Sequence, residues 1–231
     1  MSKRHTGPVP PRKCAPDLPR ELETITELRR GGEYVGGAFQ GRAGELGLTG
    51  NQWVTDEIDA RHAHLDECTI ADLSLDRLDL GGAVLADVSI CALTAAVVRA
   101  REGRWRNVAV EGGRIGSLDL SEADLTMVEL RGVRIDYLSL ASATVADLRC
   151  VDCTFGAIDA PDARMERVAF EGCRADELDS RGLRATDTNM TGLDIVTITE
   201  PSGLRGVTLS EAQVSQHAFA FAAALGIRFP A

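Results

Sequence analysis

The chain has 231 residues, enough for one large domain or two small ones, and its formal net charge is −10. Hydrophobic residues make up 44% of the sequence and aromatic residues only 4%, which suits a narrow core of aliphatic side chains. No apolar run approaches the ~18 residues that suggest a membrane-spanning helix, so we expect no membrane span. An acidic protein repels the phosphate backbone, so direct binding of nucleic acid is disfavoured too.

Charge divides the chain into a basic beginning and an acidic remainder. Residues 1–52 carry 8 basic and 6 acidic side chains, net +2, whereas residues 53–231 carry 17 basic and 29 acidic side chains, net −12. Residues 1–16 are basic and rich in proline, which predicts a disordered tail. This beginning lacks the apolar stretch of a secretory signal, so we expect a cytoplasmic protein.

Residues 17–52 are interpreted as an N-terminal helix followed by a glycine-rich cap. The helix is predicted over residues 19–30, where Leu22, Ile25 and Leu28 share one face. Residues 31–50 contain eight glycines and are expected to form a loop or an irregular first coil.

A five-residue repeat then runs from Ala63 to Ile198 without an insertion or deletion. Every fifth residue from Leu65 onward is apolar except Ser180 and Glu200. The positions two residues earlier are apolar except for Gly103, Gly113 and Thr188. Helices and ordinary strands have periods of 3.6 and 2, so a period of five indicates a repeated structural unit with two inward and three outward residues.

A second period of twenty is superimposed on the first. Residues at one of the inward positions are small in nearly every repeat, as in Ala63, Ala83, Ala123 and Ala143, and other positions prefer larger aliphatic residues. Outward glycines also recur twenty apart at 112, 132, 172 and 192, with Asp152 in the gap. Four five-residue units therefore make one turn of a square coil, with successive turns about 4.8 Å apart.

The repeat resembles that of the pentapeptide-repeat family, whose unit is approximately A-(D/N)-L-x-x. The best matches are the segments 78–80, 118–120, 123–125 and 193–195, for example Ala123-Asp124-Leu125. The resemblance covers about residues 53–217. It implies an all-β fold, a right-handed quadrilateral parallel β-helix, which we place over residues 53–209 with short helical caps at both ends.

Residues 210–231 are predicted to form the C-terminal helix. Ser210 and Gln213 form a capping box, Gly226 ends the helix, and the apolar residues Val214, Ala218, Phe221 and Leu225 share one face. The helix is interpreted as a cap over the open end of the coil, with a homodimer contact as the alternative. The dimer hypothesis names four residues: Phe219, Phe221, Leu225 and Phe229.

Residues that carry catalytic or metal chemistry are sparse. Cys150 and Cys153 have the spacing of half a zinc site, but both fall on inward positions with Cys173 and are interpreted as small core residues. Cys91 is outward and is a candidate free thiol. No catalytic signature is present, and a convex rod offers no deep pocket, so we predict no enzyme activity and no cofactor.

The remaining candidate is the outer surface of the coil. One face carries more acidic residues than the others, and we predict that it contacts a protein partner: Asp79, Glu102, Asp119, Glu122, Asp159, Asp162 and Asp179. Arg99, Arg101 and Arg181 share this face. The resemblance implies a sharper alternative, since some family members imitate DNA, bind DNA gyrase and change quinolone sensitivity. Scarce central phenylalanines and numerous outward arginines depart from that group.

Overall fold

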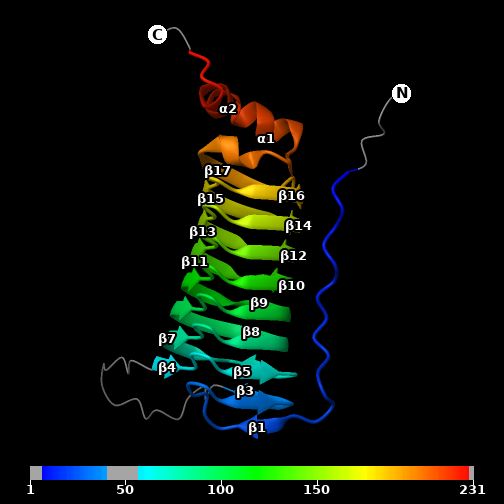
Figure 1. The fold of residues 1–231 in the computed structure, drawn as a ribbon, viewed down its shortest axis with the longest axis vertical. Coiled ribbons are helices and arrows are strands. Elements are labelled where there is room, and N and C mark those ends of the chain that lie inside the picture. The colour runs from blue at the N-terminus through cyan, green and yellow to red at the C-terminus, as the bar shows by residue number, and fades with distance from the viewer. Residues whose placement is uncertain (1–6, 41–56, 229–231) are drawn as a thin grey trace.

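The computed structural model describes residues 7–40 and 57–228 of the chain. They form a parallel β-solenoid of about eight turns with two short α-helices at its C-terminal end (Figure 1). The predicted β-helix is therefore confirmed. Trp53, the predicted start of the coil, lies outside the described residues.

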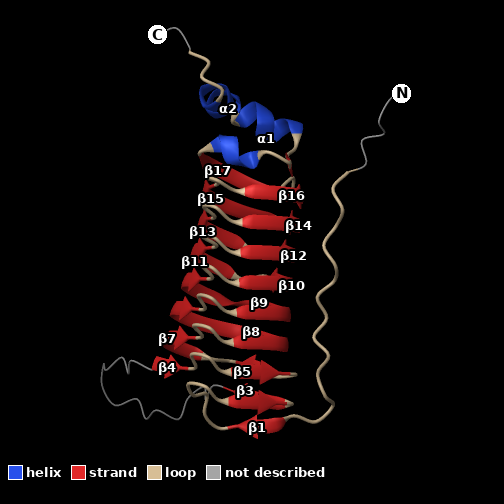
Figure 2. Ribbon diagram, viewed as in Figure 1, coloured by secondary structure: helices blue, strands red, loops and turns tan. Residues whose placement is uncertain are grey.

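Short strands open the coil and long ones form its middle (Figure 2). The first seven are β1 (Glu23–Ile25), β2 (Glu33–Val35), β3 (Gly37–Gln40), β4 (Glu57–Asp59), β5 (His64–Asp66), β6 (Thr69–Ala71) and β7 (Ser74–Asp79). The next two, β8 (Val84–Arg99) and β9 (Arg104–Asp119), each follow most of one turn.

Each later turn contributes two strands. These are β10 (Asp124–Arg131), β11 (Arg134–Ser139), β12 (Thr144–Val151), β13 (Thr154–Asp159), β14 (Arg164–Glu171), β15 (Cys173–Asp179), β16 (Arg184–Asn189) and β17 (Leu193–Thr199). The chain ends with the 3₁₀ helix η1 (Pro201–Leu204), the strand β18 (Val207–Thr208) and the helices α1 (Glu211–Gln216) and α2 (Ala218–Ala224).

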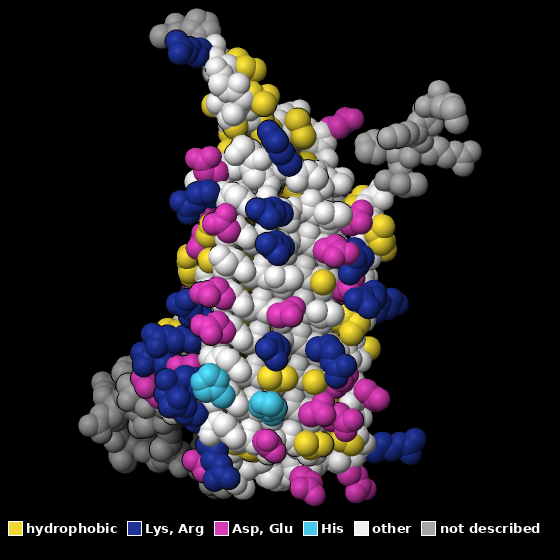
Figure 3. All heavy atoms as spheres, in the orientation of Figure 1, with side chains coloured by type: hydrophobic (Ala, Val, Ile, Leu, Met, Phe, Trp, Pro, Cys, Tyr) yellow, Lys and Arg dark blue, Asp and Glu magenta, His cyan; other side chains and the backbone are white. Residues whose placement is uncertain are grey.

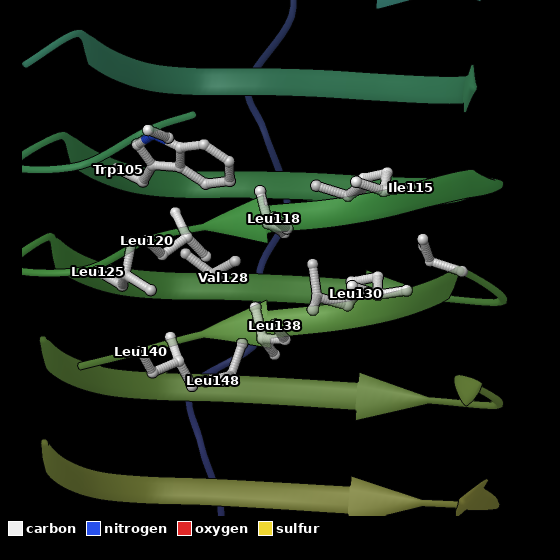
Figure 4. Packing of buried hydrophobic residues seen from close by; sticks show 14 of the residues in the cluster. Trp105, Ile115, Leu118, Leu120, Leu125, Val128, Leu130, Leu138, Leu140 and Leu148 are labelled. Atoms are coloured by element: carbon white, nitrogen blue, oxygen red, sulfur yellow. The ribbon is translucent and has the colours of Figure 1, made fainter. Parts of the chain in front are cut away.

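The register between turns is twenty residues, as the sequence predicts. Leu118 pairs with Leu138, and Leu138 pairs with Ile158, all in parallel. Figure 4 shows the side chains of Leu118 and Leu138 one above the other inside the coil. Like residues therefore stack on like residues along the axis, which fills the core without long side chains.

In six successive turns, from His62 to Gly172, three corners use a left-handed residue. In one turn these are Glu122, Met127 and Gly132, with φ of 60°, 54° and 61°. The glycines at 112, 132 and 172 lie at such corners, which explains their spacing because glycine adopts positive φ at little cost. Gly192 is not among the positive-φ residues.

The exceptions to the apolar pattern have local explanations. A Cβ on Gly103 would lie 3.0 Å from the carbonyl oxygen of Ala100 and 3.3 Å from that of Ala83, so a larger residue would crowd the backbone there. Ser180 Oγ donates to the carbonyl oxygen of Glu200 at 2.9 Å, and Thr188 Oγ1 donates to the carbonyl oxygen of Thr186 at 3.2 Å. Both buried hydroxyls therefore have hydrogen-bond acceptors.

The prediction of an N-terminal helix is wrong. Within residues 19–30 the structure has the strand β1, which pairs with β3, and β2 and β3 continue onto β5 and β6. Tyr34 pairs with Leu65 and Phe39 with Ile70, so residues 23–40 form an irregular first coil. Leu28 is buried in the core. Stacking on the first regular turn stabilises this segment more than its weak helical propensity does.

The prediction of a disordered tail is also wrong for residues 7–16. In chain order this segment runs alongside the coil from the level of β16 toward β1, opposite in direction to the advance of the turns (Figure 1). It contains no helix or strand, but its backbone is hydrogen-bonded to the coil. Residues 1–6 lie outside the described part of the chain.

Candidate interaction surfaces

The seven predicted acidic residues lie on two adjacent columns of the coil. Strand register aligns positions 79, 99, 119, 139, 159 and 179 in the first column. Glu102, Glu122 and Asp162 occupy the neighbouring corner, all three with left-handed φ and exposed side chains. We call these two columns the acidic face.

Three aspartates of the acidic face are oriented by the backbone. The Oδ1 atoms of Asp79, Asp119 and Asp179 accept hydrogen bonds from the amides two residues further on, at 3.0, 3.0 and 2.9 Å. Asp159 precedes Pro161, which has no N–H, and instead accepts a bond from Tyr137 Oη at 2.8 Å. These carboxylates shape the turn as well as charging the surface.

Arginines neutralise part of the acidic face. Arg101 pairs with Glu122 at 2.8 Å and Arg181 with Asp179 at 3.0 Å. Below them, Arg61 pairs with Asp59 at 2.6 Å, and its hydrogen bond lowers the pKa of Asp59 to about 2. Figure 3 shows acidic and basic side chains intermingled over the visible side of the coil. The surface is a mosaic of both charges.

The C-terminal helices cover the end of the coil with a different face from the predicted one. The capping box of Ser210 and Gln213 is present. However, the chain breaks into α1 and α2 at His217, and the buried residues are Gln213 and His217, with Phe221 partly buried against the core. Val214 and Leu225, predicted to face inward, are 47% and 77% exposed.

Polar side chains on this face bond the last turn of the coil. Gln213 Nε2 donates to the carbonyl oxygens of Met190 and Leu193 at 2.8 and 2.7 Å, and His217 Nε2 lies 3.0 Å from that of Ile195. The open end of the coil leaves backbone carbonyl groups without hydrogen-bond donors, and an apolar helix face cannot supply them. The helices therefore turn Gln213 and His217 toward the coil, and not the predicted apolar face.

The predicted dimer residues have different environments. Phe219 is 71% exposed and Leu225 is 77% exposed, whereas Phe221 packs partly against the core. Phe229 lies outside the described residues. Phe219 and Leu225 therefore both expose most of their side chains to solvent.

Sequence reasoning missed a third surface, the corner occupied by the N-terminal tail. Four rungs of one corner column accept backbone amides from the tail: Asp187 from Val9 at 3.2 Å, Asp147 from Arg12 at 2.9 Å, Asn107 from Ala15 at 2.8 Å and Asp87 from Asp17 at 3.3 Å. We call these four residues the corner ladder. Their spacing in multiples of twenty was the available signal.

Asp147 is the most strongly held member of the corner ladder. Its side chain is fully buried and accepts bonds from Arg167 Nε and Nη2 at 2.7 and 3.0 Å and from Arg12 Nε at 2.7 Å. The hydrogen bonds from Arg167, followed by those from Arg12, hold the pKa of Asp147 well below its usual range. The carboxylate therefore stays charged beneath the tail.

The cysteines of the core are free thiols. Cys153 N donates to Cys173 Sγ at 3.4 Å, as expected for residues stacked one turn apart. All six cysteines are unpaired, and Cys91 is only half-buried. Within the described residues no group of three or more metal-ligating side chains is present, and no helix is long and apolar enough to span a bilayer.

A five-residue repeat wound into a parallel coil defines the class of the molecule, a parallel β-solenoid with four five-residue units in each turn. Neither a family model nor a curated protein matches the sequence. Among solved structures, two of trypsin-treated QnrB1, a plasmid-mediated fluoroquinolone resistance protein, are similar at 14% identity and a TM-score of 0.24. The matches cover 90% of this chain and 96% and 95% of those chains. Such similarity is too low to transfer a function.

Proposed function

We propose that this chain is a non-enzymatic, cytoplasmic interaction protein whose acidic face binds a positively charged surface of a protein partner. The observation that carries the proposal is the alignment of all seven predicted acids on two adjacent columns. Oppositely charged surfaces attract one another and suppress wrong partners, so a fixed acidic column favours a basic partner.

The mosaic of charges favours a protein surface over a uniform array of basic groups. Arg101 and Arg181 lie between the acids and pair with Glu122 and Asp179. A partner that matches this face needs both charges in a defined pattern. Binding should therefore depend on individual residues and fall only moderately with salt.

The direct experiment reverses the charge of the three corner residues of the acidic face. Glu102→Arg, Glu122→Arg and Asp162→Arg change side chains that are exposed, so the core is left intact. The matched control, Asp152→Arg, Asp176→Arg and Asp194→Arg, makes the same change in net charge on other columns. Proteins cross-linked to the wild type in its source cells should be lost from the first variant and kept by the control. Equal capture by both variants would refute the proposal.

Binding of DNA gyrase is the second candidate. It is favoured by the net charge of −12 over residues 53–231 and by an uninterrupted twenty-residue register between positions 59 and 199. A DNA-like rod requires both features. A supercoiling assay with and without a quinolone tests this candidate. The supporting result is inhibition or drug protection by the wild type that is lost in the variant Glu102→Arg, Glu122→Arg, Asp162→Arg. No effect at any protein concentration would exclude gyrase.

The C-terminal end supports a further part of the proposal, a homodimer. Leu225 and Ile227 are 77% and 53% exposed and follow α2 beyond the last turn of the coil. Contact between two copies at this end of the rod would remove these two apolar side chains from water.

A further inference from the structure

The tail lies on the corner ladder with a three-residue period. Three of the four amides that bond the ladder, those of Val9, Arg12 and Ala15, are three residues apart, and the fourth, that of Asp17, follows two residues later. Pro8, Pro11 and Cys14 are half-buried with the same spacing. A polyproline II helix has three residues per turn, so one side of such a helix faces the coil.

The spacing of the ladder matches this helix. Val9, Arg12 and Ala15 bond Asp187, Asp147 and Asn107, which are successively two turns of the coil apart. Two turns span about 9.6 Å. Three residues of a polyproline II helix span about 9.3 Å. The two repeats therefore remain in step along the corner.

The rungs between the acceptors do not compete for the tail. Met127 and Arg167 lie between the acceptors on the same corner and have no carboxylate or amide oxygen. Pro10 and Pro11, which lack an N–H, occur between Val9 and Arg12, so the tail offers no amide there. Between Asp187 and Asp147, an acceptor on the coil and an amide on the tail are therefore both absent, whereas Lys13 and Cys14, between Arg12 and Ala15, keep their N–H groups.

Two contacts make the ladder selective for particular groups of the bound segment, and not only for an extended backbone. Arg12 Nε lies 2.7 Å from Asp147 Oδ2, with the carboxylate fully buried beneath it. Asn107 accepts the amide of Ala15 and donates Nδ2 to its carbonyl oxygen, both at 2.8 Å. The ladder thus recognises a guanidinium at one position and a peptide group three residues later.

The surface beside the ladder accommodates proline rings. Pro8, Val9, Pro10, Pro11 and Lys13 enclose a hollow of about 440 Å³ against Arg149, Val168, Ala169, Glu171 and Asn189. Val151 and Ala169, although on outward positions of the repeat, are only 7% and 8% exposed. The open hollow between the tail and the coil is therefore lined in part by the small apolar residues Val168 and Ala169.

We propose that the corner ladder is a recognition site for an extended, proline-rich segment that contains an arginine. Residues 9–17 of the same chain occupy this site, and a segment of the same kind from another protein replaces them. The tail is held mainly by backbone hydrogen bonds and one arginine, so exchange leaves the core of the coil intact. The site uses no residue of the acidic face, and its test is independent of the function proposed above.

The test uses the full-length chain with the tail weakened at one residue. Arg12→Glu places a negative charge against Asp147 and lies outside the coil, 61% exposed at its side chain. A fluorescent peptide of residues 7–18, with Cys14→Ser, is titrated against the wild type and the variant by anisotropy. Because a charge-assisted hydrogen bond contributes about 1.5–3 kcal/mol, the variant should bind the peptide about ten- to a hundredfold more tightly.

Two controls separate specific recognition of the peptide from nonspecific binding. The same peptide carrying Arg12→Ala, and the protein carrying Arg12→Glu with Asp147→Asn, should each lose at least about tenfold in affinity. The variant Arg12→Ala, which adds no charge, should also bind the wild-type peptide more tightly than the wild-type protein does. Circular dichroism checks that every variant retains the coil.

Three results would overturn the inference. These are the absence of saturable binding to the folded Arg12→Glu variant, equal affinity for the wild type and the variant, and insensitivity to the peptide arginine. Sedimentation of the wild type as a dimer that Arg12→Glu dissociates would assign the occupying tail to a second copy and overturn the intrachain arrangement.

Discussion

Individual residues of the coil are constrained by backbone geometry more than by chemistry. Gly112 and Gly113 follow one another with φ of 65° and 94°. A Cβ on Gly112 would meet nothing within 4 Å, whereas one on Gly113 would lie 2.1 Å from the carbonyl oxygen of Leu93. The sequence marks both as glycine, but only the structure separates their roles.

Gly113→Ala should therefore destabilise the fold much more than Gly112→Ala. The change at 112 introduces only the cost of a left-handed alanine, about 1 kcal/mol. The change at 113 adds a clash with the backbone of the preceding turn, and we expect at least twice that loss. Urea unfolding of the two variants measures the difference; equal losses would contradict the close approach to Leu93.

Asp147 makes stability depend on pH. Its folded pKa is depressed by Arg167 and Arg12, so its contribution is present above the unfolded pKa and is lost as pH falls through the lower folded pKa. The unfolded value is about 3.9. Acid should therefore weaken this contact only below that pH.

Asp147→Asn should lower the free energy of unfolding by about 1–3 kcal/mol at neutral pH, because charge-assisted hydrogen bonds become neutral ones. The difference from the wild type should shrink in acid, because below about pH 3.9 the unfolded wild-type chain binds a proton at Asp147 and the folded chain does not. Urea unfolding at pH 7 and pH 3 measures both effects. Asp176→Asn, an exposed carboxylate, is the control, and a pH-independent difference for Asp147→Asn would contradict the assignment.

At the scale of elements, the two ends of the coil were the least predictable. The capping box at Ser210 could be read from local sequence because it needs only two residues three apart. The buried face of α1 could not, since it is chosen by carbonyls of the last turn that are distant in sequence. At the other end, pairing of β1 with β3 overrides a helical pattern.

Gln213→Ala should test the role of the C-terminal cap. It removes two hydrogen bonds to the carbonyl oxygens of Met190 and Leu193 and the capping-box bond from the amide of Ser210, and we expect a loss of about 2–3 kcal/mol. Val214→Ala, at the adjacent exposed position, should cost less than about 0.5 kcal/mol. Thermal unfolding of both variants distinguishes this cap from one held by the predicted apolar face, for which the order would be reversed.

For the whole molecule, the long unbroken period made the coil predictable. Each inward position is specified twice, by the period of five and by the stack of twenty, as at Leu118 and Leu138. The acidic face followed from the same register. The position of the tail did not, because residues 9–17 bond rungs that are 70–178 residues away in the sequence.

The proposed homodimer is a prediction at this scale. Leu225→Glu places a charge on the exposed apolar end and should shift a dimer toward monomer, since burying an unpaired charge is costly. Analytical ultracentrifugation over a range of concentrations measures the shift. Glu211→Gln, which changes an exposed side chain of α1, is the control. If Leu225→Glu associates as the wild type does, this end of the rod is excluded as the contact.

Both proposed surfaces exist only if the twenty-residue register extends along the coil and places the tail against it. Amide hydrogen exchange of the full-length protein, read residue by residue by NMR, tests this most directly. We predict slow exchange at Val9, Arg12, Ala15 and Asp17, whose amides bond the ladder, together with slow exchange in β8 to β17. Uniformly fast exchange throughout residues 7–18 would contradict the docked tail, and fast exchange within β8 to β17 would contradict the coil itself.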